Sequence, residues 1–419
     1  MLENAPVNSW TFISKFFFRF CFTFVLLFIF SFSFDNARFD PGRYLNPFFE
    51  NLAAWTGKTF FNYGRNVNYK LESDSTGFYL NALNLLFISG FISIVWGIID
   101  KKRSDYQLLA YWFFVFIRYY LAMQLLTYGF NKIFKWQFYL PEPNTLFTTI
   151  GSTPRDFLYW TSMGTSRAYV VFSGIIEIIP ALLLLFRRTY IAGAVVALMV
   201  MINVLMINIG FNISVKLYSG FLLLLCIILL IPECKKLFKF FFAGQPVALK
   251  KWQPVYSTKT KSRIYLIVKG LVVLLIISKS FFIYLQTRNF NDDSAERPFL
   301  HGAYDVTLFV KNGDTLLPLT TDEVRWKRVF IHRRGYCIMQ NMNDEMTSYM
   351  SFVNIPEKQL MFRNEDGNGF SSLNYSEKND STLLINGTFF GDKLNLELRK
   401  IDLEKLPLMQ DDFQWAWDE

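Results

Sequence analysis

Ionisable side chains lie inside apolar segments of this sequence, where hydrocarbon makes them costly. Counting about 1.5 Å per helical residue puts Arg118 roughly 16 Å into its apolar run and Glu177 roughly 15 Å from the end of the next run. Both would then lie near the middle of a bilayer, so we expect a buried pair. Such a pair either fixes the register of two helices or lets Glu177 exchange protons or bind the head group of a ligand.

A second group of polar residues is expected nearer the outer face. The same count puts Asn203, Lys216 and Lys279 about 22 to 24 Å from the basic end of their runs. Ammonium groups and an amide at one level would suit a lipid phosphate, an anionic head group or a quinone carbonyl. For Lys279, snorkelling to the interface is the alternative. Lys132 lies on the same helix face as Arg118 and extends the polar stripe to the outer interface.

The number and positions of the histidines and cysteines exclude several kinds of haem and metal site. The only histidines, His301 and His332, lie outside the apolar segments, and the four cysteines show no C-x-x-C spacing. A histidine-ligated haem or a multi-histidine metal centre inside the bilayer is therefore excluded. We expect no metal site, and no redox cofactor motif occurs.

The elements that must position these residues are membrane helices. The chain is 52% hydrophobic and 18% charged, whereas a soluble domain carries about a quarter charged residues. We therefore expect an α-helical polytopic membrane protein with about seven spans. The expected spans cover 16–34, 78–99, 108–128 (with a possible extension through 134), 167–186, 190–208, 215–231 and 264–285.

Charge predicts the orientation of these spans. Basic residues gather in the loops at 101–103, 187–188 and 235–263, which fall on one side and mark it as cytoplasmic. The first run lacks a small-x-small cleavage site, so we interpret it as an uncleaved span entering from the cytoplasm. Residues 287–419 then lie outside an inner membrane, on the periplasmic side. The part from 288 onward has 15 Lys and Arg against 22 Asp and Glu, while the preceding part has 28 against 12.

Two shorter stretches complete the layout. After Pro41 and Gly42, aromatic and leucine residues recur at helical spacing, which indicates a helix that either lies in the membrane interface or packs on the bundle. The tail changes to a period of two, with turn signals between apolar runs. About eight short antiparallel strands are expected in a small barrel or sandwich, with a lipocalin-like meander as the preferred order.

The expected organisation follows the chain in five parts. It comprises a two-span segment (1–107) with an interfacial loop, a four-helix unit (108–232), a basic cytoplasmic loop (233–263), a seventh transmembrane helix (264–286) and an extracytoplasmic β domain (287–419).

Part of the chain resembles a known family. The four-helix unit resembles the DoxX group of the DoxD-like membrane proteins, with a Y-G-x-x-K end to its first helix, G-x-x-E in its second and a basic inner turn. The matching residues are Tyr128, Gly129, Lys132, Gly174, Glu177, Arg187, Arg188, Thr189, Asn208, Val215, Lys216, Leu217 and Ser219. The chain departs from the group at Ile179 and Pro180, where a glycine pair is frequent, and at 213–216, where the group often has V-P-V-K.

The resemblance implies a role linked to quinones, since some members are subunits of a thiosulfate:quinone oxidoreductase. The leading expectation is a quinone- or lipid-binding subunit of a membrane redox system, an oxidoreductase subunit if it is an enzyme. Arg118 and Glu177 would anchor the ligand, with Lys132 and Lys216 at the outer mouth. The rival is a non-enzymatic assembly or scaffold protein whose β domain binds an extracytoplasmic partner. A third resemblance, to the vitamin K carboxylase architecture, would need a base such as Lys216. Nucleic acid is not an expected partner, because the basic residues fall between apolar segments.

Overall fold

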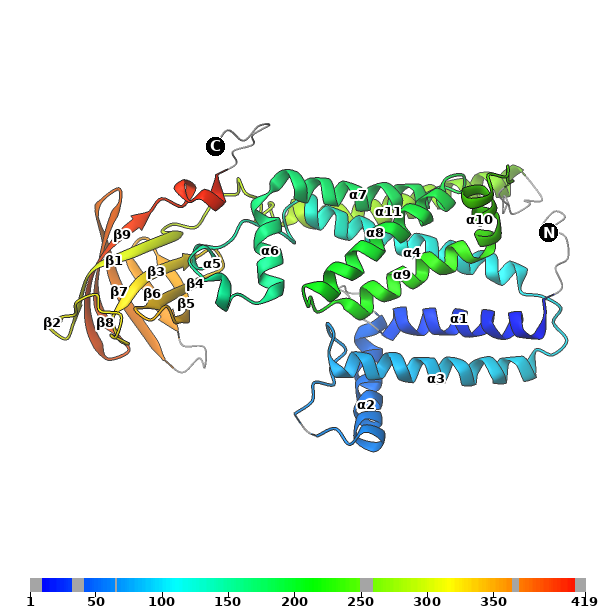
Figure 1. Ribbon diagram of the computed structural model, residues 1–419, viewed down its shortest axis with the longest axis horizontal. Coiled ribbons are helices and arrows are strands. Elements are labelled where there is room, and N and C mark those ends of the chain that lie inside the picture. The colour runs from blue at the N-terminus through cyan, green and yellow to red at the C-terminus, as the bar shows by residue number, and fades with distance from the viewer. Residues whose placement is uncertain (1–9, 32–40, 65, 249–258, 364–368, 411–419) are drawn as a thin grey trace. The chain divides into compact units, whose positions relative to one another are not determined.

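The chain folds into a helical unit and a unit built on a β-barrel (Figure 1). The computed structural model describes residues 10–31, 41–64, 66–248, 259–363 and 369–410. The helical unit comprises Met1–Phe130 and Gly174–Ile283, and the barrel unit comprises Asn131–Ser173 and Tyr284–Glu419. The segment 131–173, which connects two expected spans, is therefore grouped with the barrel.

Seven helices of the described residues are long and apolar enough to cross a membrane, which confirms the expected number. The chain is therefore a multi-pass membrane protein. The spans begin and end within a few residues of their expected ranges, except that the sixth continues to Ala243 where 231 was expected. Positions 32–34 of the first expected span lie outside the described residues. The helical elements are α1 (Phe12–Ser31), α2 (Pro41–Phe61), α3 (Thr76–Ile99), α4 (Gln107–Ile133), α5 (Pro143–Leu146), η1 (Ile150–Ser152), α6 (Arg155–Thr165), α7 (Arg167–Leu185), α8 (Tyr190–Gly210), α9 (Lys216–Leu230), η2 (Ile231–Glu233), α10 (Cys234–Ala243), α11 (Lys259–Gln286), η3 (Leu403–Lys405) and η4 (Pro407–Met409).

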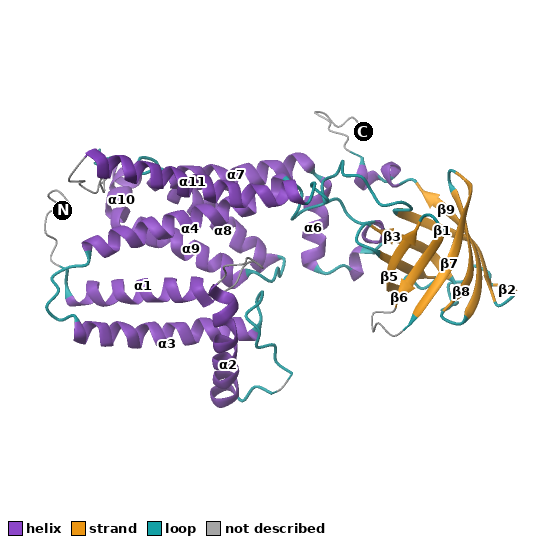
Figure 2. Cartoon of the chain, turned by 180° about the vertical axis from the view of Figure 1, so that it is seen from behind, coloured by secondary structure: helices purple, strands orange, loops and turns teal. Residues whose placement is uncertain are grey.

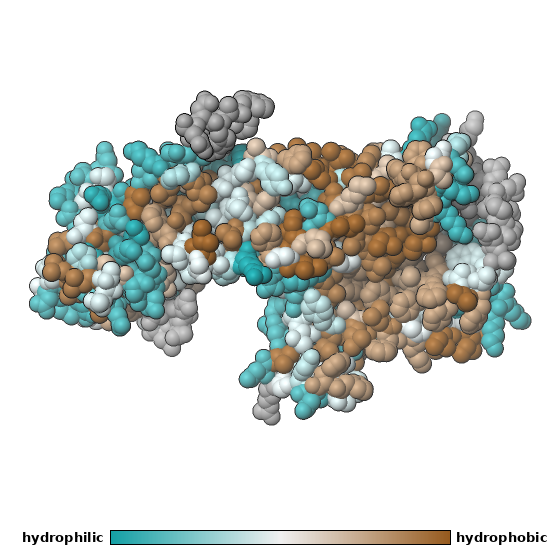
Figure 3. Space-filling model, viewed as in Figure 1, coloured by the Kyte–Doolittle hydropathy of each residue, from teal (hydrophilic) through white to brown (hydrophobic). Residues whose placement is uncertain are grey.

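The helical unit packs through aromatic rings and small residues. The ring of Phe28 stacks on that of Phe221 with centroids 4.1 Å apart, which joins α1 to α9. A Cβ atom on Gly129 would lie 2.9 Å from the carbonyl oxygen of Gly174, so the absence of side chains lets α4 and α7 approach closely. Figure 3 shows a broad hydrophobic surface over this unit. Such a surface suits contact with lipid.

The helix α2 crosses α1 and α3 at a steep angle in both views (Figures 1 and 2). Phe49 and Ala53 are buried, whereas Tyr44 and Phe48 are 80% and 62% exposed and Trp55 is exposed on the same side. The expected helix is confirmed. Its buried face packs on the bundle, and its aromatic face is free to enter a membrane interface.

The tail forms an eight-stranded antiparallel barrel in meander order, and the pairing of β1 with β9 closes it. A short ninth strand, β2, pairs with β1 outside the closed ring. The expected fold class, membrane helices followed by a small antiparallel barrel, is confirmed. The strands are β1 (Gly302–Lys311), β2 (Asp314–Thr315), β3 (Trp326–His332), β4 (Tyr336–Asn341), β5 (Met346–Asn354), β6 (Gln359–Arg363), β7 (Phe370–Asn379), β8 (Thr382–Phe389) and β9 (Asp392–Ile401).

Inward-facing side chains fill the barrel. On β9, Leu394, Leu396 and Leu398 are buried, and the intervening side chains are less so. On β5 the relation is reversed, because Ser351 is buried while Phe352 is 62% exposed. The apolar alternation therefore does not reveal β5 in the sequence.

Candidate functional site

The contact between α4 and α7 separates Arg118 from Glu177 along the helix axis, which argues against the expected pair. The glycine contact pairs Gly129 of α4 with Gly174 of α7, which sets Glu177 at the level of Tyr128 and Gly129. Arg118 lies ten residues earlier on α4, about 15 Å away along the axis. The counts failed because they took the helix ends as equal in depth, whereas α4 is 27 residues long and α7 is 19.

Arg118 instead lies near the beginning of α8. Its guanidinium carbon is 5.5 Å from the centroid of the Tyr190 ring and 5.2 Å from that of Tyr119. The residue is only 5% exposed, and within the described part of the chain its Nε and Nη2 atoms have no hydrogen-bond partner. Aromatic faces offset part of the cost of burying this charge.

Lys216 is held by an acidic residue that the sequence did not indicate. Its ammonium nitrogen lies 3.3 Å from Asp74 Oδ2. The same carboxylate accepts the backbone N–H of Lys216 at 2.9 Å and that of Leu217 at 3.1 Å. Asp74 therefore closes the first turn of α9, where a negative charge also favours the helix dipole. An ammonium engaged in this way is a poor candidate for a catalytic base.

The remaining predicted residues do not form one site with Lys216. Asn203 is exposed on α8, and Lys279 is exposed on α11. The buried amide of α8 is Asn208, which donates to Ser219 Oγ at 3.0 Å. Lys132 is buried near the end of α4.

A cavity of about 820 Å³ lies in the helical unit where α7 ends. Ile179, Leu182 and Phe186 of α7 form an apolar wall of this cavity. All three side chains are partly exposed. Leu266 of α11 also lines the cavity. Pro180 lies within this part of α7, and a helical proline removes one backbone donor and bends the helix.

The rim of this cavity is basic. Arg187 and Arg188, in the turn between α7 and α8, line it together with Lys269 of α11. The ammonium of Lys269 lies 5.5 Å from the ring centroid of Phe186. Thr189 donates its hydroxyl to the carbonyl of Leu183 at 2.8 Å, which tightens the turn that carries both arginines.

A charged cluster in the barrel unit was missed by the sequence analysis. Glu142, which immediately precedes α5, is 3% exposed and forms an ion pair with Arg333 of the β3–β4 turn. His301 Nε2 lies 3.2 Å from Glu142 Oε2, and His332 Nε2 lies 3.7 Å from the same oxygen. Both histidines of the chain therefore converge on one carboxylate. No local motif could show this, because the partners are far apart in sequence.

The electrostatics of this cluster favour a charged glutamate. Burial raises the pKa of Glu142, but the hydrogen bond from His301 and the charges of His332 and Arg333 outweigh it and lower the pKa. Burial lowers the pKa of His332 despite the opposing effect of Glu142. Backbone Arg334 N–H donates to His332 Nδ1 at 3.1 Å, so the neutral ring carries its proton on Nε2.

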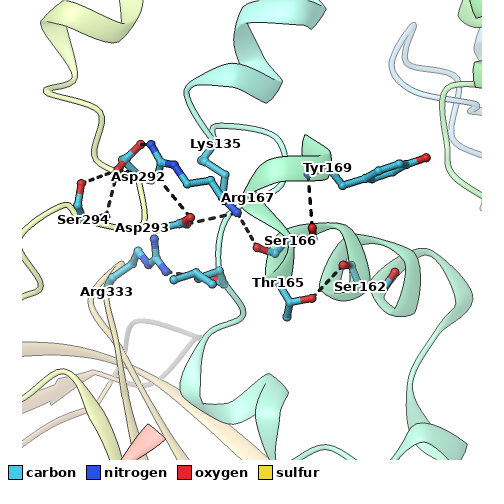
Figure 4. Close-up of polar contacts among 12 residues, drawn as sticks. Lys135, Ser162, Thr165, Ser166, Arg167, Tyr169, Asp292, Asp293, Ser294 and Arg333 are labelled. Carbon is cyan, nitrogen blue, oxygen red and sulfur yellow. Dashed lines mark hydrogen bonds and ion pairs between the residues drawn. The ribbon is translucent and has the colours of Figure 1, made fainter. Parts of the chain in front are cut away.

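A second charged group fastens the segment 131–173 to the chain before the barrel (Figure 4). Arg167 donates both terminal nitrogens to Asp292, at 3.2 and 3.1 Å. Fully buried Lys135 donates to the carbonyl of Gly164 at 2.5 Å and lies 3.3 Å from Asp293 Oδ1. Burial raises the pKa of Asp292, but the hydrogen bonds from Arg167 and Ser294 outweigh this effect and lower the pKa to about 2. Each charge in this group is paired with an opposite charge, so the group stabilises the contact between these two segments.

Within the described residues no group of three or more His, Cys, Asp or Glu side chains has an arrangement that could hold a metal ion. The cluster around Glu142 therefore offers proton exchange and ion pairing as its chemistry. The cavity beside α7 and α11 offers an apolar wall and a cationic rim.

Part of the chain is similar to a known protein. The chain is 34% identical over 131 residues to the uncharacterized protein YwoB of Bacillus subtilis, which covers 31% of this chain and 82% of that protein. No protein-family model matches the chain, so the resemblance to the DoxX group stays an interpretation of the motifs. No solved structure matches it.

Proposed function

We propose that this chain binds an amphiphilic molecule of the bilayer. By its similarity over 131 residues, the chain belongs to the family of the Bacillus subtilis protein YwoB. The cavity at the end of α7 is the observation that carries this proposal. It joins an apolar wall to a cationic rim within a multi-pass helical unit. An amphiphile needs both surfaces, because its tail avoids water and its head group keeps a polar partner.

Charge supports an orientation for the site. Lys15 donates to the carbonyl of Arg103 at 2.8 Å, which joins the basic beginning of α1 to the turn before α4. The antiparallel contact of α4 and α7 puts Arg187 and Arg188 at the same end. We place this end in the cytoplasm, since basic residues stay on that side, and the barrel in the periplasm.

The class of ligand has two candidates, a membrane lipid and a quinone. The resemblance to the DoxX group favours a quinone and a place in a membrane redox system. The cationic rim favours a lipid with a polar head. In either case the binding role moves from Arg118, Glu177, Lys132, Asn203 and Lys216 to the cavity beside α7.

Mass spectrometry of the organic extract of the purified full-length protein tests this function. We expect a stoichiometric lipid or quinone that survives exchange into lipid-free detergent. The matched control is Leu182→Trp, which fills the cavity wall, compared with Leu224→Trp on an exposed face of α9. An extract with no bound amphiphile, or equal retention in both variants, would overturn the proposal.

A second function rests on the outer wall of the barrel. Phe352 of β5 lies directly opposite Met361 of β6, and Phe370 of β7 is 74% exposed. The barrel interior is filled by its own core, so this domain is better suited to present a surface than to store a ligand. An apolar patch on an otherwise polar domain suits a protein partner.

Photocross-linking in intact cells tests the second function. A photoreactive residue at Phe352 should give a discrete protein adduct, and the same residue at exposed Lys378 should not. Adducts at both positions, or at neither, would argue against a partner-binding barrel.

A further inference from the structure

The positive charge of the cavity rim indicates which head group a bound amphiphile carries. Arg187, Arg188 and Lys269 contribute three positive charges, and no acidic residue is found among the described residues that line the cavity. Arginine binds phosphate oxygens through paired N–H groups, and lysine adds a point charge. A quinone ring is neutral and carries no charge opposite to these cations, whereas a phosphate does. The rim therefore fits an anionic head group.

The walls fit an acyl chain. Ile179 and Leu182 lie about one turn apart on α7, and both are nearly half exposed. Leu266 of α11 is 62% exposed and faces the same cavity. An acyl chain running between α7 and α11 would cover these side chains while its phosphate stays at the basic turn. The charged and apolar parts of the cavity thus follow the order of a phospholipid.

The helix α10 gives an independent indication of the same lipid class. It is short, carries Lys235, Lys236 and Lys239, and exposes Phe238 and Phe242. It follows α9 after the short helix η2 and therefore lies at the same end of the unit as Arg187 and Arg188. Basic helices with exposed aromatic residues bind interfaces rich in anionic lipid.

We infer that the cavity between α7 and α11 is a binding site for an anionic glycerophospholipid. The phosphate is held by Arg188 and Lys269, and one acyl chain lies along Ile179, Leu182 and Leu266. This inference rests on the proposed function and deepens it, because it names the head-group charge of the amphiphile.

Native mass spectrometry of the full-length protein in neutral detergent tests the inference. Phosphatidylglycerol, phosphatidylcholine and a ubiquinone are added separately, and bound molecules are counted against concentration. We expect phosphatidylglycerol to bind at least 10-fold more tightly than the other two. The double variant Arg188→Gln/Lys269→Gln should lose roughly 5-fold for each cation removed and keep its affinity for phosphatidylcholine.

A matched control separates the site from general surface charge. Lys101→Gln/Lys102→Gln removes two exposed cations from the same end of the unit and should preserve the preference for phosphatidylglycerol. The exchange Arg188→Lys/Lys269→Arg keeps both charges and should also preserve it, which guards against a folding defect in the neutral variant.

The outcomes are distinguishable. Equal binding of phosphatidylglycerol and phosphatidylcholine, or a preference that persists without Arg188 and Lys269, overturns the anionic site and leaves the proposed function standing. Tighter binding of the quinone has the same effect. Binding of none of the three overturns both.

Discussion

His301 and Glu142 lie 159 positions apart in the chain, yet the histidine Nε2 is 3.2 Å from the carboxylate Oε2. His332 and Arg333, from the end of β3 and the turn after it, contact the same carboxylate. The segment before α5 is thereby fastened to the barrel by one buried acid. Protonation of its neighbours must then alter the stability of this unit.

Acidification should destabilise the barrel unit. Burial lowers the pKa of His332 from its ordinary value of 6.5, so the unfolded chain takes up a proton at higher pH than the folded chain does. The contribution of neutral His332 to the free energy of unfolding is fully present above about pH 6.5 and is lost as the pH drops below that value. Between pH 7.5 and 5.5 we expect the thermal midpoint of the full-length protein to fall by roughly 1 to 5 °C.

Substitution of the titrating group isolates its contribution. His332→Gln should flatten the midpoint between pH 7.5 and 5.5. Tyr336→Phe alters a ring 6.0 Å from His332 without changing its charge, and should keep the slope. Glu142, whose pKa is lowered from 4.5, contributes only at still lower pH. An unchanged slope in His332→Gln would assign the pH dependence to another group.

Loss of the Glu142 carboxylate should lower the stability of the barrel unit more than loss of His332 does. Glu142→Gln keeps the shape of the side chain and leaves the buried Arg333 without its anion. Breaking a buried ion pair in this way costs about 3–5 kcal/mol. Glu357→Gln, at an exposed position where the carboxylate bonds Asn354, should cost under about 1 kcal/mol. Chemical unfolding followed at the barrel measures both, and equal costs would contradict a supporting role for Glu142.

Much of the fold was predictable because it depends on local pattern. Runs of apolar residues reveal each span, since a helix must be about 20 residues long to cross hydrocarbon. Strands such as β9 alternate strictly and were also expected. The strand β5 was not, because its inward side chain Ser351 is small and polar and its outward Phe352 is apolar.

The candidate site was less predictable because it depends on where separate helices meet. Arg118 and Glu177 were paired by counting from helix ends, but the contact of Gly129 with Gly174 sets a different register. Lys216 appeared free in the sequence, and its partner Asp74 is 142 positions away. Spacing along one helix says nothing about the depth of the next.

Removal of the cap on α9 should separate its two contributions. Asp74→Asn keeps an oxygen that can accept the backbone N–H groups of Lys216 and Leu217, but loses the charge beside the ammonium. Asp74→Ala loses both. We expect the alanine variant to cost about 0.5–2 kcal/mol and the asparagine variant less. Thermal unfolding in detergent measures them against Glu72→Gln, an exposed neighbour. Asparagine and alanine variants of equal stability would show that the backbone bonds contribute nothing.

The close approach of α4 and α7 should make one methyl group costly. A Cβ on Gly129 would lie 2.6 Å from Ile178 Cγ1 and 2.9 Å from the carbonyl oxygen of Gly174, so the helices must separate. We expect Gly129→Ala to lower stability by about 1–3 kcal/mol.

Gly220 of α9 is the matched control, because no atom lies within 4 Å of the Cβ it would gain. There the same change should be neutral or should stabilise the helix by up to about 1 kcal/mol, since alanine loses less backbone entropy than glycine. Each variant adds one methyl group to an apolar helix, at a crowded position in Gly129→Ala and at an open one in Gly220→Ala, so the difference in stability between them tests the α4–α7 contact. If Gly129→Ala unfolds at the same temperature as Gly220→Ala, that contact does not set the register on which the separation of Arg118 from Glu177 depends.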